Sequence, residues 1–286
     1  MSSFQKVVKY GAITFAIILA IGIITSIVSA VVGIFSFVTG SVGFGMKRGY
    51  VERYNESQKF DNIKSLDIDI DIGDLELLEG EDFLIEANDI SKDFKMDISR
   101  SGTLRIRENH RGLSFLRLKL NSHNDISTRI RVYIPENYKL ESTSIDAGAG
   151  KVMIEALNTE KFRISAGAGK FDGYNIVADK ASIDGGLGSF TMENVTFNNM
   201  DLNCGVGKVF LQGVFRGDNK IDCGVGDLDM EVVGNVDDYD IKIDNGIGLV
   251  RLNGERISRE YRKNNNKFDS LDIDGGVGRI ELEFQE

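Results

Sequence analysis

The sequence of 286 residues contains few of the residues that cross-link a fold or interrupt its secondary structure. It contains one proline (Pro135), two cysteines, two histidines and no tryptophan. A zinc site needs about four clustered ligands, so the chain offers little material for one. Glycine is the opposite extreme, with 32 residues, and glycine without proline indicates many regular turns rather than flexible linkers. The remaining composition, 42% hydrophobic and 27% charged, is globular.

A long segment near the N-terminus lacks charge altogether. Residues 10–46 contain no Asp, Glu, Lys or Arg, and a bilayer is crossed by about 20 apolar residues. The segment is predicted to be an uncleaved transmembrane helix in contact with the lipid bilayer. A short cytoplasmic tail (1–9) precedes it and a juxtamembrane linker (47–60) follows. Cleavage after Val28–Ala30 is the alternative, although the apolar run continues well beyond that point.

The basic residues around this segment do not decide its orientation. Lys6 and Lys9 on one side are balanced by Lys47, Arg48 and Arg53 on the other. A tail of nine residues is easily retained in the cytoplasm, and long domains are translocated largely regardless of their charge. We therefore expect a single-pass protein of the cell membrane whose C-terminal domain, residues 47–286, is extracytoplasmic.

The large C-terminal portion of the chain does not have a positive net charge. Residues 1–54 hold five basic and one acidic side chains, which leaves 29 basic and 43 acidic side chains for residues 55–286, a net charge of −14. Binding to the phosphate backbone of nucleic acids requires the opposite sign. Nucleic acid is therefore excluded as a partner.

A Gly-x-Gly pair recurs along the C-terminal half of the chain. The intervals between successive pairs are 19, 19, 19, 19, 22 and 30 residues. An aliphatic residue stands three positions before each first glycine and an apolar residue two positions after each second one. The pairs are Gly148/Gly150, Gly167/Gly169, Gly186/Gly188, Gly205/Gly207, Gly224/Gly226, Gly246/Gly248 and Gly276/Gly278.

The residues around each pair alternate between apolar and polar, which is typical of half-buried strands. Strands repeating near every 19 residues, with no helical segment between them, predict an all-β fold, a stacked β-solenoid with one copy per coil and Gly-x-Gly at the corners. We expect regular coils over 143–286 and N-terminal strands with a cap over 61–142. A degenerate copy runs from Leu66 to Glu79, with Asp71 in place of the first glycine.

The two cysteines occupy one column of this repeat. Cys204 and Cys223 stand where other copies carry Ala147, Ala166 or Gly185, so the position requires a small side chain. Stacked coils would place the two Cα atoms about 4.8 Å apart, which is compatible with a disulfide. Small core residues, a disulfide and a metal site are the three interpretations, and the first is favoured.

Glycines and aspartates of the repeat also admit chemical interpretations. A phosphate-binding loop requires a following helix, and no copy has one, so the glycines are expected to supply positive φ or clearance at a corner. The residue two before each first glycine is polar and predicted to face outward: Asp146, Ser165, Asp184, Asn203, Asp222, Asp244 and Asp274. Ser and Asn alternate with Asp as far as Asp222, which dilutes charge repulsion. A solvated edge is favoured over a calcium or ligand-binding stripe.

The two long intervals contain insertions, which emerge from a solenoid as loops. The interval of 30 contains ERISREYRKNNNKFD, a basic excursion in an acidic domain. It could contact an anionic polymer or lipid headgroup, or it could be a loop without a ligand. The candidate interaction residues are Arg256, Arg259, Tyr261, Arg262 and Lys263.

The order TLRIRE, then RIRVYIPENYKL, then SIDAGAGKVMI resembles the toastrack family, also labelled "putative adhesin", over roughly residues 60–286. The resemblance implies a bacterial β-strand-repeat domain of unknown function that is often associated with membrane segments and envelope-stress modules. It brings no catalytic residues. The single predicted span differs from the multi-span modules of that family.

Three functions follow from these features. A non-catalytic binding or scaffold module at the bacterial cell envelope, engaging an envelope polymer or a membrane protein, is preferred. A regulator of envelope-stress signalling through its membrane span is the alternative. A polysaccharide-acting enzyme is disfavoured because no Arg or Lys accompanies Asp184 and Asp222 in successive copies. No catalytic, cofactor-binding or metal-binding residue is predicted.

Overall fold

A computed structural model describes residues 53–108 and 128–285, which belong to one compact unit made almost wholly of strands. The one helical element in these ranges is a three-residue 3₁₀ turn, η1 (Val236–Asp238). The all-β prediction is therefore confirmed. The predicted span, residues 10–46, lies outside the described residues. In the part that the structure describes, there is no helix with the length and apolar character of a membrane span.

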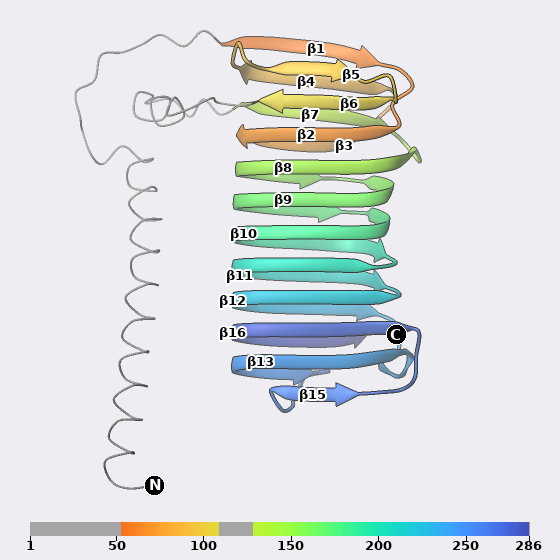
Figure 1. The fold of residues 1–286 in the computed structure, drawn as a ribbon, viewed down its shortest axis with the longest axis vertical. Helices are drawn as coiled ribbons and strands as arrows, with labels where there is room; N and C mark the ends of the chain where they lie inside the picture. Colours follow the sequence, from red (N-terminus) through yellow and green to blue (C-terminus); the bar gives the residue numbers. More distant parts are fainter. Residues whose placement is uncertain (1–52, 109–127, 286) are drawn as a thin grey trace, which may run out of the picture. The chain divides into compact units, whose positions relative to one another are not determined.

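The regular part of the fold is a stack of parallel strands, each of which forms one coil (Figure 1). Equivalent residues 19 apart pair directly, so that Ile183 lies between Ile164 and Leu202. The inward columns make a continuous apolar core between the sides of the coils. These strands are β8 (Lys139–Ile154), β9 (Leu157–Tyr174), β10 (Ile176–Phe197), β11 (Met200–Phe215) and β12 (Asp218–Val233).

Stacking itself explains both glycine columns. A Cβ atom added to Gly205, the first glycine of its pair, would lie 2.5 Å from the carbonyl oxygen of Gly186 in the neighbouring coil. At Gly207, the second glycine, the corresponding distance to the Gly188 oxygen is 1.8 Å, and φ is +153°. The first column therefore provides clearance only, whereas the second provides clearance and a backbone conformation that side chains disfavour.

The degenerate copy forms the coil next to β8, as its sequence predicts. β2 (Ser65–Ile72) and β3 (Asp74–Gly80) both pair with β8, and Gly73 bends the chain between them. Further strands extend the stack beyond this coil and end in antiparallel edges. They are β1 (Tyr54–Phe60), β4 (Phe83–Ile90), β5 (Lys95–Ile98), β6 (Thr103–Glu108) and β7 (Arg129–Pro135).

The stacking order departs from the sequence at the C-terminal end. We expect successive copies to form successive coils, but β16 (Asp269–Gln285) lies between β12 and β13 (Tyr239–Leu252), as Figure 1 shows. That expectation is wrong for the last two copies. The two insertions are the reason. They allow β13 to leave the position next to β12 empty, and the chain then returns and places β16 in that position.

Because β16 lies next to β12, β13 is the terminal coil of the stack. Short antiparallel strands cover part of its edge. β14 (Glu255–Arg256) pairs with the end of β13, and β15 (Glu260–Lys263) pairs with its first half. An uncovered parallel edge would invite pairing with other chains, and antiparallel, charged edge strands oppose this.

Candidate binding surfaces

The crossover of the last two copies creates an open groove. Its lining comes from the turns that join β10 to β11, β11 to β12 and β12 to β13, together with the residues that enter β16. Its volume is about 760 Å³, which is large enough for a small ligand or a segment of a polymer. Its polar and aromatic lining includes Asn198, Asn199, Arg216, Asn235, Lys267 and Phe268.

Phe268 is the most exposed large apolar residue of the described chain, at 87%. The segment leading to it is held in place, because the carboxylate of Asp240 accepts hydrogen bonds from the backbone N–H groups of Asn265 (2.7 Å) and Lys267 (3.2 Å). The side-chain amide of Asn265 also donates to the carbonyl of Tyr239, at 3.0 Å. An aromatic ring is therefore presented to solvent next to the groove on an anchored segment.

Charges of both signs lie around Phe268. Lys267 forms a salt bridge with Asp238 at 3.3 Å, and Arg216 is exposed on the groove wall. Tyr239 is buried beneath the groove, and its burial raises the pKa of its hydroxyl. The groove thus combines an exposed aromatic platform with amides and charged groups that can exchange hydrogen bonds with a polar ligand.

The predicted basic excursion is mostly part of the cap. Tyr261 pairs opposite Ile243 and packs partly against the core, while Arg262 lies opposite Lys242. Arg259 donates a hydrogen bond to the carbonyl of Gly246, and Lys263 forms a salt bridge with Asp237 at 2.6 Å.

Arg256 belongs to β14, opposite Arg251. The candidate residues therefore do not converge on one site, and their binding to an anion stays a prediction. Sequence reasoning missed Phe268, although it is the only phenylalanine in the polar excursion and that isolation was a usable signal.

The predicted acidic column faces outward and alternates as expected in its first half. The side-chain amide of Asn203 donates to Asp184 at 3.1 Å, so the interposed residue bonds the carboxylate as well as separating it from Asp222. Beyond that point, the inserted β16 places Asp222, Asp274 and Asp244 in three consecutive coils. The dilution therefore holds over β8 to β12 and is lost beyond β12.

Within residues 53–108 and 128–285, no group of three or more His, Cys, Asp or Glu side chains is arranged to hold a metal ion. Cys204 and Cys223 pair directly in adjacent coils as free thiols. A hydrogen bond with Cys223 and burial both raise the pKa of Cys204. Both side chains pack against the core, in agreement with the favoured interpretation.

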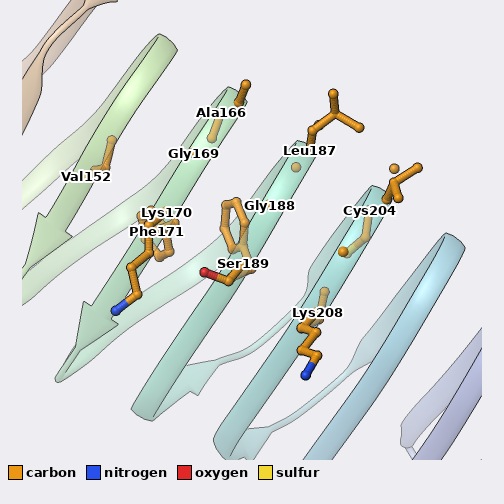
Figure 2. Close-up of a pocket in the computed structure, with 18 of the residues that line it drawn as sticks. Val152, Ala166, Gly169, Lys170, Phe171, Leu187, Gly188, Ser189, Cys204 and Lys208 are labelled. Carbon is orange, nitrogen blue, oxygen red and sulfur yellow. The ribbon is translucent and has the colours of Figure 1, made fainter. Parts of the chain in front are cut away.

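A small void lies under the Gly-x-Gly bends, between the small-residue column and the stacked rings of Phe171 and Phe190 (Figure 2). Their centroids are 4.5 Å apart, with 14° between the ring planes. The void measures about 30 Å³, the size of a single water molecule. Its lining also includes the exposed side chains of Leu187 and Val206, so it is partly open to solvent.

A family model described as Toastrack DUF4097 matches residues 63–262. Solved structures with similar folds include a "putative adhesin" from Bacteroides fragilis, with 13% identity, a TM-score of 0.41 and coverage of 81% of this chain and 97% of that one. A "putative lipid binding protein" from Parabacteroides distasonis has 14% identity, a TM-score of 0.42 and coverage of 82% and 96%. No protein in a search of curated sequences matches this chain significantly.

Proposed function

Because this chain belongs to the Toastrack DUF4097 family, whose model matches residues 63–262, we propose that it is a non-catalytic binding module of the bacterial cell envelope. The observation that carries the proposal is Phe268, presented at 87% exposure on the rim of an open groove. Single exposed apolar side chains are common on protein surfaces, but Phe268 is carried by a segment that Asp240 fixes beside an open groove, and ligand sites are typically concave.

The chemistry of the groove favours a polysaccharide of the envelope as the ligand. The C–H faces of a sugar ring pack on an aromatic ring, and its hydroxyl groups exchange hydrogen bonds with amide, carboxylate and guanidinium groups. The groove offers the ring of Phe268 beside Asn198, Asn235 and Arg216. A binding site that lies across several turns suits a polymer, because successive sugar units can contact successive coils.

Replacing Phe268 with alanine is expected to weaken the binding of the full-length protein to purified envelope polysaccharide or peptidoglycan by about tenfold or more, as for an aromatic anchor of an interface. Co-sedimentation and calorimetry would measure it. Ile98→Ala, an exposed apolar residue on β5 at the other end of the stack, is the control and should bind like the wild type.

A comparison variant, Arg256→Ala with Arg259→Ala, tests the basic excursion separately. A loss of binding in that variant together with wild-type binding by Phe268→Ala would move the site from the groove to the excursion. If neither the wild type nor any variant binds a polysaccharide, the proposed ligand class is wrong.

We further propose that residues 10–46 anchor the module and that residues 47–286 lie outside the cytoplasmic membrane. The uncharged length of this segment and the short N-terminal tail support this orientation. Protease added to intact, wall-stripped cells is expected to digest the C-terminal domain. Digestion only after lysis would place the domain in the cytosol and contradict the proposal.

A further inference from the structure

The middle residue of each Gly-x-Gly is aliphatic, and the structure stacks these residues into an exposed row. We call this row the bend ridge: Leu187, Val206, Val225, Val277 and Ile247 in five consecutive coils, extended by alanines in β8 and β9. The five large side chains are 37–65% exposed. Strand spacing makes these five coils about 19 Å long.

Such a row needs an explanation because every member of it is free of charge. Backbone packing requires glycine on both sides, but the middle side chain projects from the bend, as Leu187 does in Figure 2. An exposed, solvated position in an acidic domain would normally carry polar residues. A continuous exposed apolar row is characteristic of an interaction surface.

The two sides of the ridge carry opposite charges. On one side lies the acidic column, with Asp184, Asp222 and Asp274 among its members. On the other lies a row that immediately follows the second glycines and has a net positive charge, although Asp227 interrupts it; Figure 2 shows Lys170, Ser189 and Lys208 in sequence. We call it the basic row, and from β8 to β13 in stacking order it reads Lys151, Lys170, Ser189, Lys208, Asp227, Arg279 and Leu249. Lys170 and Arg279 also pair with carboxylates of their own face, Asp172 at 2.8 Å and Asp229 at 3.2 Å.

A furrow runs between the ridge and the acidic column. It is shallow, with a volume of about 440 Å³, and it is lined by first glycines of consecutive coils and by the small residues before them, Ala166, Gly185 and Cys204. Because these residues are glycines or have small side chains, the furrow leaves room for an aliphatic row from a partner. The protein therefore carries a ridge and a furrow of matching period side by side.

We propose that two copies of this chain associate through their bend ridges, about a two-fold axis parallel to the stacking direction. In that arrangement the ridge of each copy enters the furrow of the other, and coils at the same height meet. The acidic column of each copy then lies opposite the basic row of its partner. Such a contact is isologous and closes as a dimer.

Charge decides between this arrangement and its alternatives. A two-fold axis perpendicular to the stacking direction would place acidic column against acidic column, which is repulsive. An anionic lipid surface would attract the basic row but repel Asp184, Asp222 and Asp274 on the other side of the ridge. A second copy in parallel orientation brings the net-negative column of each copy against the net-positive row of the other. Among residues at equal height, Asp222 and Asp227 are the one pair of like charges that meets.

The first test changes the ridge. Val206→Lys in the full-length protein, purified in detergent micelles, is expected to raise the dimer dissociation constant by about tenfold or more, measured by analytical ultracentrifugation. Val177→Lys is the matched control, because Val177 has a similar exposure of 44% but lies away from the bend. Both variants should melt at the wild-type temperature, since both positions are exposed.

The second test swaps charges. Asp184→Lys and Lys208→Glu are each expected to weaken the dimer, and the double variant is expected to recover most of the wild-type affinity. In the parallel dimer these two positions lie one coil apart across the interface, so that exchanging both restores attraction. Recovery in the double variant would not occur in the perpendicular arrangement.

The third test determines how the two copies are oriented relative to each other. Cys204 and Cys223 are first replaced by alanine, the residue that β8 and β9 carry in the same column. A single cysteine is then introduced, either as Leu187→Cys or as Val277→Cys. The parallel arrangement predicts that each variant cross-links to itself with a short bismaleimide. Self-cross-linking at neither position, a monomeric wild type, or a dimer that Val206→Lys leaves intact would overturn the proposal.

Discussion

Gly207→Ala is expected to destabilise the protein by about 3–5 kcal/mol and to lower its melting temperature by about 10 °C, measured by calorimetry on the full-length protein. The added Cβ would lie 1.8 Å from the carbonyl oxygen of Gly188, and this oxygen belongs to the backbone of the adjacent coil. The two coils must separate or lose pairing at the bend. The unfavourable φ of +153° adds to that cost.

Gly254→Ala separates the two contributions. Gly254 also has a positive φ, +77°, but no atom lies within 4 Å of its added Cβ. Its substitution should cost about 1 kcal/mol, the strain of the left-handed conformation alone. Equal effects of the two substitutions would show that coil stacking does not explain the glycine columns.

Val209→Asp is expected to be comparably severe, at about 3–5 kcal/mol. Val209 is buried in the inward column, where it lies between Phe190 and Leu228 of the adjacent coils. A carboxylate there has no partner in the apolar column, so it must be buried unpaired, be protonated or distort the coil. Urea unfolding monitored by circular dichroism would measure the loss.

The control for Val209→Asp is Val177→Asp, the same chemical change at an exposed position of β10. Its effect should remain within about 0.5 kcal/mol, as for most surface substitutions. If Val209→Asp also unfolded at the wild-type urea concentration, the assignment of inward and outward faces would be wrong.

Sequence alone determined the architecture of the regular coils, because their pattern is local and repeated. The aliphatic position of Ile183, the first glycine at Gly186 and the apolar position of Phe190 recur at the same offsets in all copies that carry a Gly-x-Gly pair. Period-two alternation with glycine bends is compatible with few folds other than stacked strands. The small column at Cys204 and Cys223 followed from the same register. The family resemblance added the context of the cell envelope, which the coils themselves do not encode.

The exposure of the bend ridge could not be read from alternation. Counting in steps of two from Ile183 places Leu187 on the inward side, as for a straight strand. The bend at Gly186 and Gly188 breaks this alternation and turns Leu187 outward. Whether a residue at a bend faces the core depends on three-dimensional geometry that the pattern does not specify.

Only the tertiary structure decided the order of the last coils, and with it the groove. The copies in β13 and β16 carry the same pattern, so either could stack on β12. Long-range contacts select β16: Arg279 bonds Asp229, and the carboxylate of Asp269 accepts from the Gly217 N–H at 2.7 Å. β13 is then left at the end, where β15 can cover it. Local sequence cannot encode this choice because the energies that distinguish the two orders arise between residues about 50 positions apart.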